Sequence, residues 1–327
     1  MKKYLIFAAT VFLSLQVMAA TLGNINDTYW HDGFASYRAT QKGGVISFTG
    51  GTLHEGGYDF KVVKGRGGKM VVKSVYDAMN YITTPGRSVS GSSIERRSIN
   101  GQDMLIITSP QGKITDVLLA MNGDFDTALK EQLNQQLDGV YRDNNGQYYS
   151  FDGFGRMSIG DSQAKLEPFS FVYIYETPSN VIDFPALKKH YSFEPQGQNF
   201  KFDEVKTVDG MSWDEDPGIE TIKSAKINKL RGLRYSGDGL WPITSAEILT
   251  SGYFECYSAD DLRLMRNDIY ARHGYKFKDS SLRNIFEKQS WYKPVTSNAN
   301  SLKFNEVERI NIALIQNMEK IKAQNDF

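Results

Sequence analysis

The sequence of 327 residues contains one cysteine, Cys256, so an intramolecular disulfide is excluded. Basic and acidic side chains are equal in number, 38 of each, and this balance argues against nucleic-acid binding, which needs a basic domain. None of the four histidines has a metal-ligand spacing, and we expect no metal site and no cofactor. The four are His31, His54, His190 and His273. By contrast, 29 glycines and 18 tyrosines are typical of a turn-rich β-protein.

The first 20 residues read MKKYLIFAATVFLSLQVMAA and have the layout of a secretory signal peptide. Lys2 and Lys3 form the positive start, an apolar run of about 12–15 residues follows, and small residues end it at Ala19. That run is shorter than the roughly 20 residues that span a bilayer, and no later segment is long and apolar enough to do so. We expect removal of residues 1–19, a mature N-terminus near Ala20 or Thr21, and an exported protein, periplasmic or extracellular. No cysteine lies near the cleavage site, which excludes a lipoprotein anchor.

Residues 20–138 are predicted to form an N-terminal β-rich domain. Glycine pairs mark turns throughout this block, and short apolar runs lie between them. In one of these runs Tyr58, Phe60 and Val62 alternate with polar residues, as in a half-buried strand.

Three further segments of this block have patterns of their own. A helix is predicted over 125–137, where leucines recur every four residues, with Asp124 or Asp126 as its N-cap. A second, short helix is expected over 74–82. The Ser-, Gly- and Arg-rich stretch 85–97 is expected to be a long loop.

Residues 139–250 are predicted to form a second β-rich domain. Apolar residues flank an Asp-Asn-Asn-Gly turn at 143–146 and predict a hairpin, because such turns need positive φ angles. The aromatic and β-branched run 169–175 predicts a strand, and another hairpin is predicted over 191–202. In both blocks a glycine is followed, after a short spacer, by Ser-Phe-x-Gly. This similarity suggests two related β-units, although the two spacers differ in length by one residue.

Residues 251–327 change to helical periodicity. Three helices are predicted: the first is capped by Ser258 and ended by Gly274, and the others cover 281–288 and 306–323. The fold class is therefore α+β, with one or two antiparallel β-rich units, built from hairpins and small barrel- or sandwich-like, before a small three-helix domain. We expect this C-terminal domain to fold alone, with marginal stability. We also expect burial of the lone thiol, because a free cysteine packs as a small hydrophobe.

Three segments of this tail carry a family pattern. They are RNDIYARHGYKF at 266–277, WYKP at 291–294 and NEVERINI at 305–312. In order and spacing they resemble the YARHG domain, over about residues 251–320. The resemblance implies an extracytoplasmic bacterial module without an established activity, so it supports export and supplies no catalytic residues.

Motifs for catalysis are short and incomplete. Gly160-Asp161-Ser162 resembles the start of a GDSL hydrolase block, and Ser162 to Lys165 satisfies S-x-x-K, but the partner motifs of both are missing. A hairpin turn explains this segment equally well. Three adjacent acids follow a tryptophan at 213–216, whereas a glycosidase needs two carboxylates on opposite sides of a sugar. No catalytic residue is assigned.

The tail carries a local excess of positive charge. Between Arg263 and Lys293 there are eight basic and three acidic side chains. Two interpretations are open: a cationic, aromatic surface for an anionic or glycan partner, or side chains that pack the core and bond helix ends. The candidate binding residues are Arg266, Tyr270, Arg272, His273, Trp291 and Tyr292.

The leading hypothesis is an exported bacterial envelope protein with a binding or scaffold role, towards a cell-wall polymer, another anionic envelope polymer or an envelope protein. The alternative is a cell-wall or glycan hydrolase that uses carboxylates of the central block. A purely structural accessory subunit is a third class. The sequence leaves the ligand and the oligomeric state open.

Overall fold

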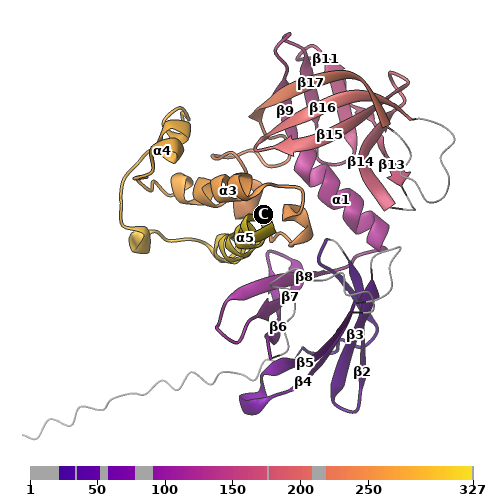
Figure 1. Cartoon of the computed structure of the whole chain (residues 1–327), viewed down its shortest axis with the longest axis vertical. Coiled ribbons are helices and arrows are strands. Elements are labelled where there is room, and N and C mark those ends of the chain that lie inside the picture. Colours follow the sequence, from indigo (N-terminus) through magenta and orange to yellow (C-terminus); the bar gives the residue numbers. More distant parts are fainter. Residues whose placement is uncertain are drawn as a thin grey trace, which may run out of the picture.

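The structure is a computed structural model that describes residues 22–33, 35–51, 58–77, 91–174, 177–207 and 219–325. A closed β-barrel, a second β-sheet and a helical region follow one another along the chain (Figure 1). This is the predicted α+β class, with two β-rich units before a helical C-terminal region. The predicted signal peptide lies outside the described residues. No helix in the described part of the chain is both long and apolar enough to cross a membrane.

The first unit is an antiparallel barrel in which each strand pairs with the next and the last pairs with the first. Its elements are β1 (Thr28–His31), β2 (Ser36–Lys42), β3 (Val45–Gly51), β4 (Tyr58–Lys64), η1 (Arg66–Gly68), β5 (Met70–Asp77), β6 (Ser93–Ile99), β7 (Gln102–Thr108) and β8 (Ile114–Ala120). Alternate side chains fill the interior, where the rings of Phe48 and Phe60 stack with centroids 4.4 Å apart. Closure leaves this sheet without an exposed edge.

Strand β7 is buried on both faces. Leu105 and Ile107 belong to the barrel interior, whereas Met104 and Ile106 point outward into the core of the helical region. The continuous apolar run Met-Leu-Ile-Ile follows from this double burial, because a strand covered on both sides does not alternate with polar residues.

The second unit is a nine-stranded antiparallel sheet in the order β12-β11-β10-β9-β17-β16-β15-β14-β13. Its strands are β9 (Gly139–Arg142), β10 (Tyr148–Phe151), β11 (Arg156–Gly160), β12 (Glu167–Pro168), β13 (Ser170–Ile174), β14 (Thr177–Phe184), β15 (Lys189–Gln196), β16 (Asn199–Thr207) and β17 (Ile219–Arg231). The last strand pairs with the first, and the edges are β12 and β13. Both predicted hairpins are confirmed, since β9 pairs with β10 and β15 pairs with β16.

Helix α1 (Phe125–Leu137) connects the two sheets and has the predicted bounds. Asp124 is its N-cap, and the carboxylate accepts a hydrogen bond from the backbone N–H of Thr127 at 2.8 Å. Leu133 and Leu137 pack into the core of the second sheet. Figure 1 shows the helix between that sheet and the barrel.

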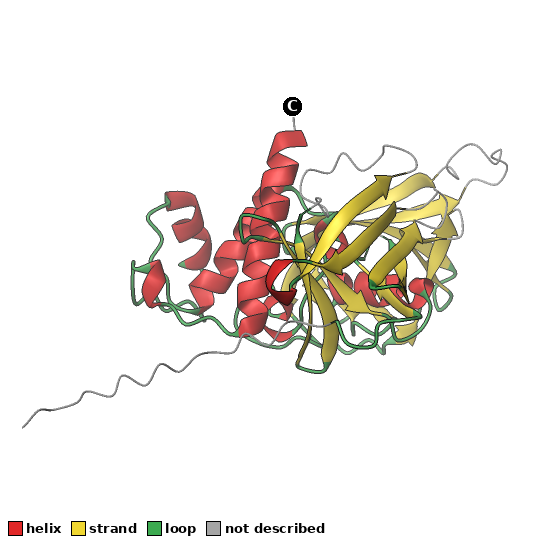
Figure 2. Ribbon diagram, turned by 90° about the horizontal axis from the view of Figure 1, so that it is seen from below, coloured by secondary structure: helices red, strands yellow, loops and turns green. Residues whose placement is uncertain are grey.

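The helical region contains α2 (Ile243–Ala246), η2 (Gly252–Phe254), α3 (Ala259–Arg272), α4 (Ser280–Phe286), η3 (Ala299–Ser301) and α5 (Glu306–Asn325). The three predicted helices are α3, α4 and α5, and α5 packs against α3 (Figure 2). Ser258 forms the predicted cap of α3 as a capping box with Asp261. Gly274 ends that helix at φ 76°, in the left-handed region that glycine adopts without strain.

The helical core extends beyond residues 251–327 in two directions. It includes apolar side chains of the segment 240–249, and it includes the outward residues of β6, β7 and β8. Because β17 ends at Arg231 and Tyr235 is already in this core, we place the start of the helical region near residue 232. The fragment 251–327 lacks much of this core, which argues against its independent folding.

Three expectations need correction. Residues 74–77 belong to β5 rather than to a helix, and 93–97 belong to β6 rather than to a loop, because both segments pair into the barrel. The rest of those two segments lies largely outside the described residues. Cys256, in the segment between η2 and α3, is exposed rather than buried.

Candidate functional site

Two consecutive polar networks arise from the Tyr-Ala-Arg-His-Gly motif at the end of α3. In the first, buried Asp268 accepts hydrogen bonds from the backbone N–H groups of Leu240 and Trp241 at 2.8 and 3.1 Å. The guanidinium of Arg272 lies 3.5 Å from the same carboxylate and donates to both hydroxyl groups of α2 at 2.5 and 2.6 Å. Burial raises the pKa of Asp268, and Arg272 and the two backbone donors oppose that rise. The network fastens the segment before α2 to α3.

The second network joins the end of α3 to the start of α5. The ring atom Nε2 of His273 lies 2.9 and 3.0 Å from the two carboxylate oxygens of Glu308. Glu308 also accepts from the Ser245 hydroxyl and from the backbone N–H of Asn305, and the Asn305 side chain accepts from the Glu308 N–H in return. This reciprocal pair is the N-terminal capping box of α5. The motif histidine therefore holds the start of the last helix.

The other four predicted binding residues also have partners inside the helical region. Arg266 forms a two-pronged ion pair with Glu319 on α5, at 2.8 and 3.2 Å. Tyr270 packs edge-on against two aromatic rings, with centroids 4.8 and 5.9 Å away. Trp291 packs against a ring of α4, and the Tyr292 hydroxyl donates to a backbone carbonyl at 2.6 Å.

The structure thus distributes the six predicted residues over one domain core and its rim. Arg272 meets α2, His273 meets Glu308 of α5, and Trp291 and Tyr292 meet α4. Their contacts are those of the second interpretation, in which they pack the core and bond helix ends. A role in binding stays a prediction for these residues.

A different set of cations is exposed on the lobe formed by residues 276–293, around α4. Arg263 is neutralised by Asp279 at 2.9 Å. Five basic side chains of the lobe are exposed and have no ion-pair partner among the described residues. They are Lys276, Lys278, Arg283, Lys288 and Lys293. Glu287 is the remaining acidic residue of this segment, so the lobe is strongly positive in an otherwise neutral chain.

The comparison with family models fits this geometry. Residues 239–320 match the model of the YARHG domain. This segment is a YARHG domain. The match starts at residue 239 rather than 251, and it thus includes the segment that Asp268 and Arg272 fasten to α3. YARHG domains occur in exported proteins. Searches of curated proteins and of solved structures found no match to the chain.

The sequence shows the excess of positive charge in the tail, but it does not show which of these cations have ion-pair partners. The eight cations were counted together, and only the structure separates paired from unpaired ones. Glu319 lies 53 residues after Arg266, so nothing local in the sequence indicated that pair. The excess of five basic over two acidic side chains in the short segment 276–293 was the available signal.

The described residues of the central block do not contain a site for the hydrolase reaction considered as the alternative. The acidic segment 213–216 lies outside them, and Ser162 is in a turn closed by hydrogen bonds to Asp161. Within the described ranges, no group of three His, Cys, Asp or Glu side chains is arranged to hold a metal.

Proposed function

We propose that this protein is exported with removal of residues 1–19 and binds an anionic polymer of the bacterial envelope through the lobe 276–293 of its YARHG domain. The observation that carries the proposal is the set of five exposed, unpaired cations on this lobe. The signal-peptide pattern and the occurrence of YARHG domains in exported proteins support the location.

The physical basis is electrostatic attraction that no internal partner satisfies. Exposed cations without acidic neighbours attract a polyanion over about 8–10 Å at moderate salt, and added salt screens that attraction. The paired cations Arg266 and Arg272 contribute less, because their charge is already compensated by carboxylates within the domain. The lobe also has Trp291 half-buried beneath it, which supplies a partly accessible ring.

The test uses the full mature chain and purified peptidoglycan, whose peptide stems carry carboxylates, in a sedimentation assay. A variant in which all five lobe cations are replaced by Gln should lose most of its binding, and wild-type binding should fall as salt is raised. The control has five exposed lysines of the barrel replaced by Gln, which gives the same change in net charge. They are Lys42, Lys61, Lys64, Lys69 and Lys113. Equal binding by the lobe variant and the wild type would refute the lobe as the binding surface.

Export is tested separately. Mass spectrometry of the protein recovered from the envelope should show a mature N-terminus near Ala20 or Thr21. An intact Met1 on envelope-localised protein would contradict cleavage, whatever the outcome of the binding assay.

A further inference from the structure

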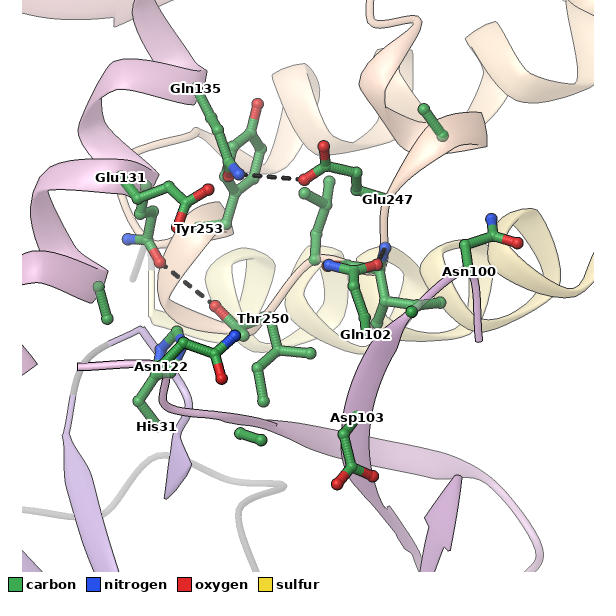
Figure 3. A pocket seen from close by; sticks show the side chains of 18 of the residues that line it. His31, Asn100, Gln102, Asp103, Asn122, Glu131, Gln135, Glu247, Thr250 and Tyr253 are labelled. Carbon is green, nitrogen blue, oxygen red and sulfur yellow. Dashed lines mark hydrogen bonds between the residues drawn. The ribbon is translucent and has the colours of Figure 1, made fainter. Parts of the chain in front are cut away.

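A polar cavity of about 530 Å³ lies where the barrel, α1 and the helical region meet (Figure 3). Six segments line it: the end of β1, the turn between β6 and β7, the end of β8, α1, Arg234 after β17, and the stretch 246–253. Its size falls within the range of about 300–1,000 Å³ that is usual for small-molecule sites. Such sites are mostly apolar, and this one is lined mainly by amide, carboxylate and hydroxyl groups.

The walls are held by hydrogen bonds between units. Gln102 of β7 binds both the N–H and the carbonyl of Ile248, at 2.8 and 3.3 Å. Gln132 of α1 accepts from the Thr250 hydroxyl at 3.3 Å and donates to the carbonyl of Gly33 at 3.4 Å. Gln135, about one turn later in α1, donates to Glu247 at 3.1 Å. The cavity is therefore a built feature rather than a gap between loosely placed units.

Three side chains that line the cavity have polar atoms without a hydrogen-bond partner among the described residues. The Nδ1 atom of His31 is buried and has no hydrogen-bond partner among the described residues, and a buried polar atom without a partner is costly. The side-chain amides of Asn100 and Asn122 likewise make no hydrogen bond within the described structure. Asn100 is presented at the tip of a turn in which it and Gly101 both have positive φ. Figure 3 shows His31 and Asn122 together on one side of the cavity, near Thr250, and Asn100 on the opposite side, beyond Gln102.

The charges around the cavity largely cancel. Asp103 is paired with Arg96 at 2.5 Å. Arg234 lies 3.4 Å from Glu247 and 3.5 Å from Glu131, so one guanidinium serves both carboxylates. Three carboxylates and two guanidinium groups leave a single negative charge, on the well-exposed Glu131. No uncompensated cation among the described residues lines the cavity to attract an anion.

Burial lowers the pKa of His31, and the nearby carboxylates of Asp32 and Glu131 oppose that shift. This shift favours the neutral ring, in which one nitrogen donates a hydrogen bond and the other accepts one. It adds hydrogen-bonding capacity to the cavity without adding charge.

We propose that this cavity binds an uncharged carbohydrate of one or two sugar rings. Amide side chains and a neutral imidazole both donate and accept hydrogen bonds, and so do sugar hydroxyl and acetamido groups. An unpaired buried acceptor or donor gains a partner when such a ligand enters, which favours binding. The site is a binding site, separate from the cationic lobe.

Isothermal titration of the full mature chain with four defined sugars tests the proposal. N-acetylglucosamine and its β-1,4-linked disaccharide are the neutral probes, glucosamine is the cationic probe and glucuronate is the anionic probe. We expect the neutral sugars to bind at millimolar or lower concentration and more tightly than both charged ones. Tighter binding of either charged sugar, or no heat with any neutral sugar at millimolar concentration, would overturn the assignment.

Variants locate the binding in the cavity. Asn122→Ala and Asn100→Gly each remove an exposed amide that holds no other part of the protein, and His31→Phe keeps a ring without its nitrogen atoms. Each should weaken neutral-sugar binding by about 3- to 10-fold, the usual effect of losing one hydrogen bond. The matched control is Asn144→Ala, which removes an exposed amide from a turn of the second sheet. Unchanged affinity in both asparagine variants would refute the site even if His31→Phe fails to fold.

Discussion

In both β-units the strands are antiparallel and the last strand pairs with the first, yet their cores differ in kind. Among the described residues, four of the fifteen core side chains of the barrel are aromatic, against nine of thirteen in the second sheet. Aromatic side chains bury more apolar area each, and their edge-to-face contacts add to that. The second sheet therefore gains more burial from each core residue than the barrel does.

The difference in cores matches a difference in dependence on neighbours. Outward side chains of β6, β7 and β8 belong to the core of the helical region, so barrel and helical region share one apolar interior. The core of the second sheet contains no residue after Ile227. We infer that the barrel and the helical region unfold together, and that the second sheet unfolds separately.

Fragments test this inference with the largest expected effect. Residues 121–231, which include α1 and the second sheet, should fold alone because they contain the whole of that core. Residues 22–120 should not, because Met104, Ile106 and Val117 would lose their cover. Circular dichroism and two-dimensional NMR of both fragments measure this. A cooperatively folded 22–120 fragment would contradict the shared core.

Neighbouring core positions sharpen the comparison. Ile106→Ala and Ile107→Ala should each cost about 2–5 kcal/mol of unfolding free energy, since each deletes a buried side chain on a different face of β7. Hydrogen exchange should increase in α3 and α5 for Ile106→Ala more than for Ile107→Ala. In Phe202→Ala, the matched change in the second sheet, faster exchange should be confined to that sheet. Uniform changes over all three units would show a single cooperative molecule instead.

Gly274→Ala should destabilise the helical region by about 1 kcal/mol or more, because alanine is strained at positive φ. The added Cβ would also lie 2.8 Å from the carbonyl oxygen of Lys293. Gly112→Ala is the control, since its φ is 79° and the added Cβ would meet nothing within 4 Å. Thermal unfolding should show a larger decrease for Gly274→Ala, and the transition of the second sheet should stay in place. Equal decreases would show that the close contact is relieved without cost.

Acid should weaken the same region, with the smallest expected effect. Burial raises the pKa of Glu308, but hydrogen bonds from Ser245, His273 and the Asn305 backbone outweigh it, and the net shift is downward. A carboxyl with a lowered folded-state pKa contributes stability above its ordinary value of 4.5, and this contribution is lost as pH falls through the folded-state pKa. Glu308→Gln should reduce this acid dependence in the helical region. An unchanged slope of stability against pH below 4.5 would contradict the assignment.

Local features of the fold could be predicted from the sequence because their causes are local. The bounds of α1, the Ser258 cap, the positive φ of Gly274 and the hairpin at 143–146 all depend on residues within a few positions of one another. The pairing of β8 with β1 and of β17 with β9 could not be predicted, because it joins segments about 90 residues apart. The strand at 93–99 was not predicted because its sequence is mostly polar, and it forms a strand through its pairing with β7.

The candidate sites divide in the same way. The charge of the lobe 276–293 can be counted along the chain, but the partner of each cation depends on how α3 and α5 pack. The cavity could not be anticipated at all, since its lining comes from six segments between residues 31 and 253. Only His31 was singled out from the sequence, and its orphaned ring nitrogen is a property of the assembled structure.

The second sheet begins and ends at one place. Asp138, directly before β9, accepts hydrogen bonds from the backbone N–H groups of Leu233, Arg234 and Tyr235, directly after β17, at 2.6 to 3.3 Å. The two ends of the second sheet are thus held together by the Asp138 carboxylate. In topological terms the second sheet is a cassette inserted between barrel and helical region, and domains whose ends meet are those that genetic insertion, loss or circular permutation can rearrange. Asp138 therefore marks the junction at which the second sheet could be removed or replaced without disturbing the core that the barrel and the helical region share.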